Sequence, residues 1–323
     1  MTPFKSFLLI MVLLFGTIGV VAGYKKYQNK RSAQIVQEAS HSFPSEEGLI
    51  EIELEKKEEV SEEPAPLPQK EVPQADRIHL LFKENSPLDI VETIQYKSRA
   101  PWKGGRTAWL CDYASHYQTP IDFILKSMPK VDPKNIRDGQ RFSVFRKGKD
   151  FSFYLVVDAS RTKLWLYLIQ PEKKSHLLLK SYDVGLGKRD EEKESGLLTP
   201  LGAYTLGKRC AVFKPRMMGM HKKKKVELMT VFGTRWIPFE SECGTCTEPA
   251  KGFGIHGFPY IREGSRLVED TSSISDYQSD GCIRLRAEDV EELYAVIAAR
   301  KATVEIVKDF YEASIPYTEQ SIE

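Results

Sequence analysis

Short apolar runs separated by turns dominate the sequence from residue 151 to residue 307. Two of them, 153–157 and 164–169, flank the turn at 158–162 and predict a β-hairpin. An amphipathic helix is expected at 287–299, where apolar residues recur at helical spacing. Further strand-like runs lie at 180–186, 203–206, 231–239, 252–255 and 303–307. Short strands at this spacing predict a mainly β domain, a sandwich or barrel with one or two helices, over residues 150–310.

Residues 78–148 carry a different pattern. Apolar residues fall at helical spacing over 109–117 and again over 121–128, where Pro120 occupies the first turn. A turn is expected at 132–135, followed by a short strand at 140–145. The order strand, helix, helix, strand predicts a small α+β unit.

This unit resembles a LysM module, a small glycan-binding fold. The resemblance rests on Tyr113-Ala114-Ser115-His116-Tyr117-Gln118-Thr119, on 121–125 and on Asn135-Ile136-Arg137-Asp138-Gly139-Gln140-Arg141-Phe142. The family's opening strand and Gly-Asp turn are not recognisable between Gln95 and Arg106. The resemblance implies glycan binding; the alternative is a degenerate module that only packs against its neighbour.

The N-terminal 30 residues contain a near-continuous apolar run of 17 residues, Ser6–Ala22. This length suits an uncleaved membrane anchor, since about 17–25 residues span a bilayer. A cleaved signal peptide is the second interpretation and a buried helix the third. Lys5 precedes the run and four basic residues follow it closely, which by the positive-inside rule favours a cytoplasmic C-terminal part.

Residues 31–77 are rich in glutamate and, from Pro64 onward, in proline. Such a composition cannot bury enough apolar surface to fold, so we expect a disordered linker. Residues 311–323 are expected to form a tail. The formal charge of the 323-residue chain is only +2, which gives no global argument for nucleic acid as a partner.

Five cysteines are present, so at least one thiol is unpaired within the chain. A lone thiol with a distant histidine is a candidate nucleophile. Cys243 and Cys246 lie three residues apart and favour a local disulfide. A redox switch is an alternative, and a zinc site using Cys243, Cys246, His256 and Cys282 is the last, because it would consume a candidate nucleophile.

The C-terminal domain resembles the YkuD-type L,D-transpeptidases. Five separated segments carry the resemblance in the family's order: 156–167, Val184-Gly185-Leu186-Gly187-Lys188, Thr199-Pro200-Leu201-Gly202, Ile255-His256-Gly257 and Ser279-Asp280-Gly281-Cys282-Ile283-Arg284-Leu285. It covers about residues 152–308. The resemblance implies that Cys282 is the nucleophile and His256 its base, with the backbone carbonyl just after His256 orienting the ring. A thiol needs such a base because the thiolate is the attacking species.

The neighbours of Cys282 have roles that this chemistry suggests. Gly281 leaves the amides of Gly281 and Cys282 open to a developing oxyanion, a contribution of about 3–4 kcal/mol. Arg284 would hold a substrate carboxylate or pair internally. Gly257, Ser279, Asp280 and Arg284 are the expected substrate-contacting or supporting residues.

Asp280 departs from the family, which usually has histidine immediately before Gly-Cys. A carboxylate here would orient an imidazolium, or would raise the pKa of the thiol by like-charge repulsion. The basic run 221–225 would steer acidic peptides, but a solvated loop is preferred. The polar segment 262–279 lengthens the spacing between His256 and Cys282 and would fold over the cleft.

The resemblance implies cross-linking of diaminopimelate residues in peptidoglycan stem peptides, with release of D-alanine and a role in wall organisation and cell shape. No metal or cofactor is expected. Resolution of the acyl-enzyme by water would give an L,D-carboxypeptidase, and by a protein lysine would attach that protein to the wall. A peptidoglycan-binding scaffold with a decayed site is the rival. The positive-inside rule favours a cytoplasmic C-terminal part, but a reaction on the wall requires the outer side, and this requirement takes precedence. The expected location is therefore the cell envelope, anchored in the inner membrane with the catalytic domain in the periplasm, or exported.

Overall fold

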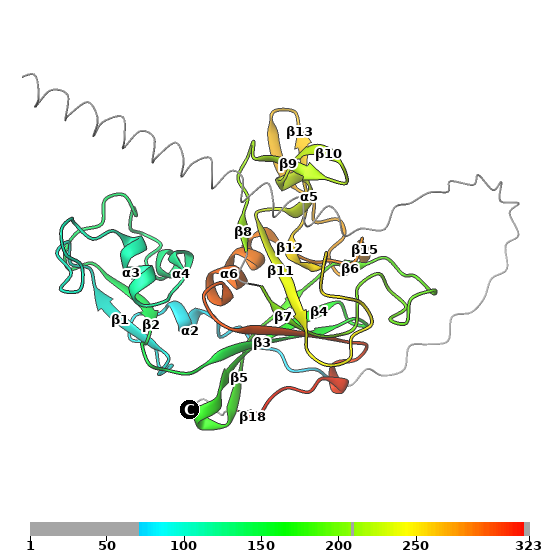
Figure 1. Cartoon of the computed structure of the whole chain (residues 1–323), viewed down its shortest axis with the longest axis horizontal. Coiled ribbons are helices and arrows are strands. Elements are labelled where there is room, and N and C mark those ends of the chain that lie inside the picture. The colour runs from blue at the N-terminus through cyan, green and yellow to red at the C-terminus, as the bar shows by residue number, and fades with distance from the viewer. Residues whose placement is uncertain (1–70, 208–209, 320–323) are drawn as a thin grey trace, which may run out of the picture.

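The computed structural model describes residues 71–207 and 210–319 (Figure 1). One large, curled sheet forms the C-terminal domain, with strand order β16-β12-β11-β7-β17-β3-β4-β5-β18, and β8 pairs with β11 beside it. Its strands are β3 (Ser152–Asp158), β4 (Lys163–Gln170), β5 (Ser175–Asp183), β7 (Gly202–Leu206), β8 (Ala211–Val212), β11 (Arg235–Glu242), β12 (Gly254–Gly257), β16 (Ile283–Leu285), β17 (Ala302–Val307) and β18 (Thr318–Glu319). The expected mainly β fold is confirmed.

The hairpin of β3 and β4 lies in the interior of this sheet. Its runs are apolar on both faces because both faces are buried. Leu155 and Val157 enter the main core, whereas Val156 and Trp165 enter a second cluster on the other face with Phe310. The Trp165 indole donates a hydrogen bond of 2.6 Å to the carbonyl of Pro73.

Helix α6 (Ala287–Ile297) covers the face that holds the main core. Val290, Leu293 and Val296 are fully buried there, as their spacing predicts. Each buried side chain of this size contributes about 1.5–3 kcal/mol. Because α6 follows β16 directly, its packing fixes the strand that begins just after Cys282.

The middle unit consists of α2 (His79–Phe82), β1 (Val91–Gln95), α3 (Leu110–His116), α4 (Ile121–Ser127) and β2 (Arg141–Phe145). β1 and β2 pair antiparallel, and the order strand, helix, helix, strand is confirmed. The unit shares a core with the sheet domain through Phe123, Phe145 and Phe151. The Arg300 guanidinium lies 5.0 Å and 4.4 Å above the rings of Phe145 and Phe151.

Two expected boundaries were wrong for residues near the ends of the described chain. Residues 71–77 belong to the sheet domain, not to a linker. The Arg77 amide donates a hydrogen bond of 2.6 Å to the Leu179 carbonyl, and the backbones of Asp76 and Lys180 form an isolated antiparallel β-bridge. In the expected tail, β18 pairs parallel with β5. The expected anchor at 6–22 and the linker up to residue 70 lie outside the described residues. Among the described helices, none is long and apolar enough to span a bilayer.

Two β-hairpins stand beside each other at one end of the sheet domain (Figure 1). The first joins β9 (Met218–His221) to β10 (Lys224–Glu227) and leads into α5 (Met229–Phe232). The second joins β13 (Tyr260–Glu263) to β14 (Arg266–Glu269), and an Arg262–Glu227 ion pair links the two hairpins. We name them the cover hairpins. The second replaces part of the loop expected at 262–279.

The strand expected at 231–239 was wrong in its first half. Residues 229–232 form α5, Gly233 turns the chain at φ 61°, and β11 begins only at Arg235. A side chain at Gly233 would lie 2.7 Å from the backbone of Gly257. The close approach of these two backbones therefore requires glycine at this turn.

Candidate active site

The register of two parallel strands assembles the site. In the pairing of β12 with β16, His256 lies opposite Arg284 and Ile255 opposite Ile283. Partners in register share a face of a sheet, and side chains alternate along each strand. His256, Arg284 and Cys282, which immediately precedes β16, therefore lie on the same face, although 26 residues separate His256 from Cys282.

His256 is buried as a neutral imidazole. Its side chain is buried, and Nδ1–H donates 2.8 Å to the Gly257 carbonyl, the backbone oxygen expected to orient the ring. This bond assigns the proton to Nδ1 and leaves the lone pair on Nε2. Burial, together with the positive charge of Arg284, lowers the pKa of His256 to about 3.

Cys282 is only 5% exposed, and its Sγ lies 3.8 Å from the Gly252 carbonyl. Burial raises the pKa of the Cys282 thiol to about 12, although a hydrogen bond from the Gly254 backbone and the charge of Arg284 act in the opposite direction. The structure therefore holds a neutral thiol and a neutral imidazole, not a thiolate–imidazolium pair.

The loop before Cys282 is closed by Ser279. Its Oγ donates 2.6 Å to the Cys282 carbonyl and accepts 3.1 Å from the Gly281 amide. β15 (Tyr277–Ser279) pairs with β6 (Leu186–Gly187), which anchors this loop on the sheet domain. The expected oxyanion role of the Gly281 amide is not met in this conformation, because that amide already bonds to Ser279. The Cys282 amide stays the predicted donor.

Gly281 has φ 116°, and a side chain there would lie 2.7 Å from the Leu198 carbonyl and 2.5 Å from Cε1 of Phe253. We expect Gly281→Ala to shift the loop and lower the rate of acylation about 10²–10³-fold, the size of one lost oxyanion donor. Single-turnover mass spectrometry measures this rate. Gly244→Ala is the control, since Gly244 also has a positive φ, 90°, but open space around it. Equal losses in both variants would contradict the steric argument.

Arg284 is half-buried beside Cys282. Among the side-chain contacts of the described residues, its Nε atom is buried without a hydrogen-bond partner. Burial lowers the pKa of Arg284, and the nearby acidic groups of Cys282, Asp280 and Asp270 oppose this. The backbone of Arg284 is fixed by two 2.8 Å hydrogen bonds to Gly185. The backbone of Arg284 is thus fixed, and the Nε atom of its guanidinium keeps hydrogen-bonding capacity.

Asp280 is half-exposed and forms two ion pairs. Its Oδ2 lies 3.1 Å from Lys222 Nζ and its Oδ1 lies 3.7 Å from Lys188 Nζ. Burial raises the pKa of the Asp280 carboxyl, but the Lys222 hydrogen bond and the charges of both lysines outweigh this and lower it below its ordinary value. Lys222, in the basic run 221–225, is exposed to solvent as preferred but also pairs with Asp280.

Side chains that follow the first cover hairpin lie around Cys282 and His256. Phe232 and Trp236 contact the His256 ring at centroid distances of 5.5 Å and 5.8 Å. Tyr260 and Leu267 of the second cover hairpin pack against the same cluster. The cluster that includes Cys282 consists of Phe213, Leu228, Met229, Phe232 and Trp236. Because these side chains leave Cys282 only 5% exposed, we expect the cover to move before a peptide reaches it.

The expected disulfide between Cys243 and Cys246 is not formed. Both thiols are free, and Cys246 Sγ donates 3.2 Å to the Ala203 carbonyl. The packing of Gly202 against Cys246 holds that thiol in place, since a side chain at Gly202 would lie 2.6 Å from Sγ. Within residues 71–207 and 210–319, no group of three or more His, Cys, Asp or Glu side chains is placed to hold a metal ion.

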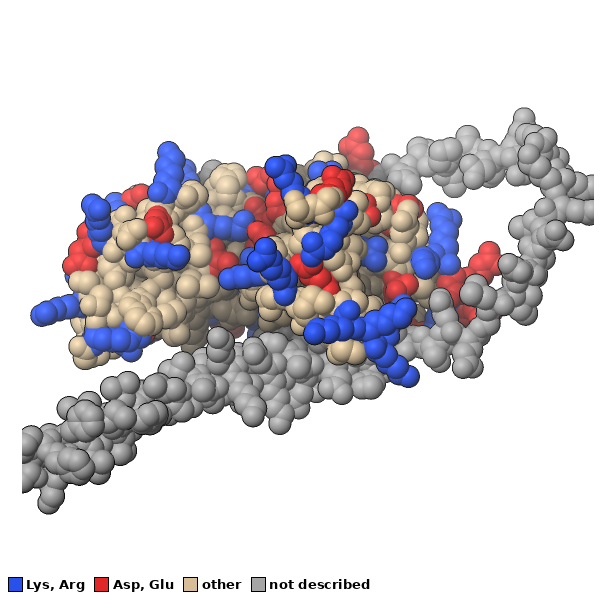
Figure 2. All heavy atoms as spheres, turned by 90° about the horizontal axis from the view of Figure 1, so that it is seen from above, with Lys and Arg blue, Asp and Glu red and all other residues tan. Residues whose placement is uncertain are grey.

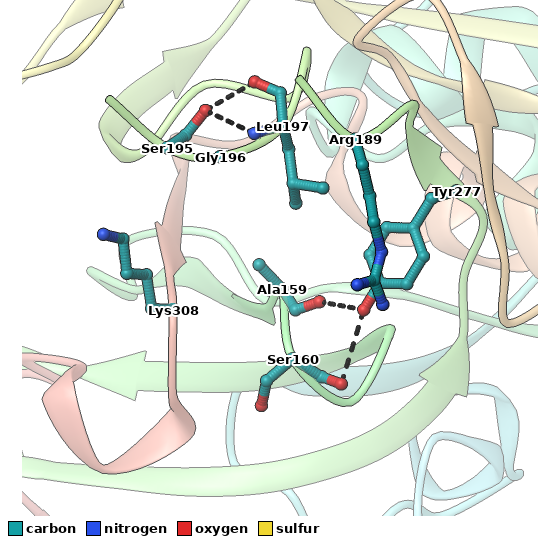
Figure 3. Close-up of a pocket in the computed structure, with 8 residues that line it drawn as sticks. All are labelled: Ala159, Ser160, Arg189, Ser195, Gly196, Leu197, Tyr277 and Lys308. Atoms are coloured by element: carbon teal, nitrogen blue, oxygen red, sulfur yellow. Dashed lines mark hydrogen bonds between the residues drawn. The ribbon is translucent and has the colours of Figure 1, made fainter. Parts of the chain in front are cut away.

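A pocket of about 220 Å³ lies apart from Cys282 and His256 (Figure 3). Tyr277 forms one wall, with its hydroxyl donating 2.7 Å to the Ala159 carbonyl and the Arg189 guanidinium 5.0 Å above its ring. The Lys308 ammonium points away from Arg189 (Figure 3). The two cationic side chains of this pocket, Arg189 and Lys308, therefore do not converge on one ligand. Across the face shown in Figure 2, Lys and Arg side chains lie scattered among Asp and Glu.

Burial of neutral His256 has a consequence for stability. In the unfolded chain the pKa of His256 returns to about 6.5, whereas in the folded protein it is about 3. Between these values the unfolded chain gains a proton that the folded protein does not. The free energy of unfolding should therefore fall as the pH falls through this window, by up to about 1.4 kcal/mol per pH unit, and stay unaffected above it. Urea unfolding of wild type and His256→Gln at pH 7.5 and 4.5 measures this; equal pH dependence in both would contradict it.

A buried cysteine and a histidine with a free Nε2 on one face of a sheet are the parts that cysteine acyl-transfer chemistry requires. Residues 152–306 match the YkuD family, the L,D-transpeptidase catalytic domain. The family match therefore supports a YkuD-type catalytic domain at 152–306, where the sequence resemblance placed it. The LysM resemblance of residues 78–148 stays a prediction. No curated protein matches the chain.

Three solved structures are similar to part of the chain. Bd1075 from Bdellovibrio bacteriovorus is 16% identical with a TM-score of 0.34, over 49% of each chain. The helical cell shape determining protein Pgp2 from Campylobacter jejuni is 21% identical with a TM-score of 0.34, over 52% of this chain and 50% of that one. L,D-transpeptidase 1 from Mycobacterium tuberculosis is 15% identical with a TM-score of 0.22, over 51% and 68%. The chain spans about half the length of the first two.

Proposed function

We propose that this protein is a cysteine-dependent L,D-transpeptidase acting on the stem peptides of peptidoglycan. The observation that carries the proposal is the register of β12 and β16, which sets Cys282, His256 and Arg284 on one face. The match of residues 152–306 to the L,D-transpeptidase catalytic domain supports the reaction class. Nucleophile, base and a cation for a carboxylate are the groups that such a reaction needs.

In the first half-reaction, Nε2 of His256 takes the proton of the Cys282 thiol as sulfur attacks the carbonyl between diaminopimelate and the terminal D-alanine. The new C–S bond places negative charge on the carbonyl oxygen, facing the Cys282 amide. The imidazolium then protonates the leaving nitrogen, the C–N bond breaks and D-alanine departs. Because the thiol and imidazole start neutral, this transfer needs no separate proton source.

In the second half-reaction, an amine attacks the thioester and gives its proton to His256. A C–N bond forms, the C–S bond breaks and the thiol is restored. An amine of a neighbouring stem gives a cross-link; water gives an L,D-carboxypeptidase, and a protein lysine gives attachment to the wall. The stem amine is the acceptor we propose.

Arg284 is proposed to hold a carboxylate of the stem peptide. Its buried Nε without a partner among the described side chains supports this use over internal pairing. A guanidinium binds a carboxylate through two parallel hydrogen bonds, which also fixes the orientation of the peptide. The rigid backbone of Arg284 would keep that orientation constant relative to Cys282.

The test is incubation of the purified protein with a diaminopimelate-containing tetrapeptide stem, followed by mass spectrometry of the products. We expect released D-alanine together with cross-linked dimers, and a tripeptide product would identify water as the acceptor. If neither D-alanine nor a covalent adduct forms, the rival interpretation of a peptidoglycan-binding scaffold with an inactive site holds instead. Periplasmic location, anchoring by residues 6–22 and glycan binding by residues 78–148 are parts of this proposal that rest on the sequence.

A further inference from the structure

The ion pair between Lys222 and Asp280 joins the cover to the nucleophile loop. Lys222 and Lys223 form the two-residue turn of the first cover hairpin, with φ angles of 45° and 62°. The Lys222 ammonium reaches 58 residues along the chain to Asp280, which is two residues before Cys282. In the closed structure, an ammonium group is therefore already bound beside the nucleophile.

Opening of the cover changes the surroundings of Asp280. The cluster over Cys282 includes Met217 and Leu228, which directly flank this hairpin, and residues of α5, so we expect admission of a peptide to displace the segment that carries Lys222. Lys188, at 3.7 Å, is then the described lysine that stays near the carboxylate. Exposed ion pairs of this kind are weak, so a substrate can replace Lys222 at little cost.

We propose that Asp280 is a specificity-determining residue that binds the side-chain ammonium of the donor stem peptide, and that Lys222 occupies this position when no substrate is bound. The inference rests on the proposed function and names the group that the site selects. Asp280 recognises the ammonium while Arg284, two residues beyond Cys282, is available for the carboxylate. A diamino acid at the scissile position carries both groups.

The bound ammonium belongs to the donor and not to the acceptor. A carboxylate stabilises the protonated form of an amine and so raises its pKa. An acceptor amine must lose its proton before it attacks, and pairing with Asp280 would hinder that step. The donor ammonium takes no part in bond formation, so the same pairing costs the reaction nothing.

The experiment compares two donor tetrapeptides, one with a free diaminopimelate side-chain amine and one with that amine acetylated. Acylation of Cys282 is followed by mass spectrometry without any acceptor, so that only the donor is tested. We expect wild type to prefer the free amine about tenfold or more, a typical effect of one charged contact. Asp280→Asn should lose that preference by slowing only the free-amine donor, and Asp280→Glu should restore part of it.

Lys222→Gln should keep the preference and acylate faster with the free-amine donor, because the competing ammonium is gone. Lys223→Gln is the matched control, since it removes the same charge from the same turn and should behave as wild type. Equal slowing of both donors by Asp280→Asn, or no preference in wild type, would overturn the inference.

Failure of the proposed function gives a different result. If neither donor acylates wild type, calorimetric binding of the two peptides to the full-length protein still decides the matter. Tighter binding of the free-amine peptide, lost in Asp280→Asn, supports the ammonium site; equal binding of both peptides by wild type rejects it.

Discussion

Cys282→Ala is expected to abolish acylation and turnover. The thiol sulfur is the atom that would form the covalent bond, and the register of β12 and β16 places Cys282 on the face that carries His256. Removal of a nucleophile costs on the order of 10⁶-fold in kcat where it has been measured in a comparable catalytic unit. Steady-state release of D-alanine from a tetrapeptide measures the loss.

The matched controls are Cys111→Ala and Cys243→Ala, which each remove an exposed thiol. Both should release D-alanine at the wild-type rate. Folding of Cys282→Ala should be checked by urea unfolding, since Cys282 is part of a buried cluster and its sulfur leaves a small void. Residual turnover of Cys282→Ala within tenfold of wild type would contradict its assignment as nucleophile.

His256→Gln is expected to slow acylation by about 10²–10⁴-fold, the usual contribution of a general base. Burial holds the pKa of the Cys282 thiol at about 12, so without the imidazole the thiolate must come from hydroxide. The acylation rate of the variant should then rise about tenfold per pH unit, because the pH stays below the thiol pKa. Wild type should depend little on pH above the pKa of His256. Single-turnover acylation between pH 6 and 9 measures both profiles.

His176→Gln is the matched control, because His176 also hydrogen-bonds a backbone carbonyl, that of Pro316 at 2.8 Å, but on the far edge of the sheet. It should leave rate and pH profile unchanged. A pH profile of His256→Gln parallel to that of wild type would show that another group takes the proton.

Local patterns predicted the frame of the site well. Apolar runs predicted β3, β4, β7 and β17, and helical spacing predicted α6. These elements are each specified by the alternation of their own residues. The segment from Ser279 to Leu285, together with His256, predicted Cys282, His256 and Arg284 as site residues. The register of β12 and β16 places these three on one face, and their catalytic roles stay a prediction.

What the sequence did not predict depends on contacts between distant segments. The ion pair between Lys222 and Asp280 joins residues 58 positions apart. From the sequence alone, a basic run that forms such a pair cannot be distinguished from a solvated loop. The Gly281 amide was expected to be open, but its partner Ser279 is fixed only once β15 pairs with β6. The helix α5 was missed because four apolar residues before a glycine fit a strand equally well.

Asp280 was expected to raise the thiol pKa as a nearby like charge. In the structure, burial is the main cause of the raised pKa of the Cys282 thiol. The charge of Asp280 contributes least among the causes that act on this pKa. Two lysines largely compensate the carboxylate. Its position therefore favours a role in substrate selection over a role in setting the reactivity of the thiol.

The most direct test of the central claim is the site of covalent modification. Wild-type protein is incubated with a carbapenem, a β-lactam that acylates nucleophilic cysteines of this class, and is then digested and mapped by mass spectrometry. The account predicts one adduct, on the peptide that contains Cys282, absent in Cys282→Ala and much slower to form in His256→Gln. An adduct on Cys243 or Cys246 instead, or unmodified wild-type protein, would contradict it.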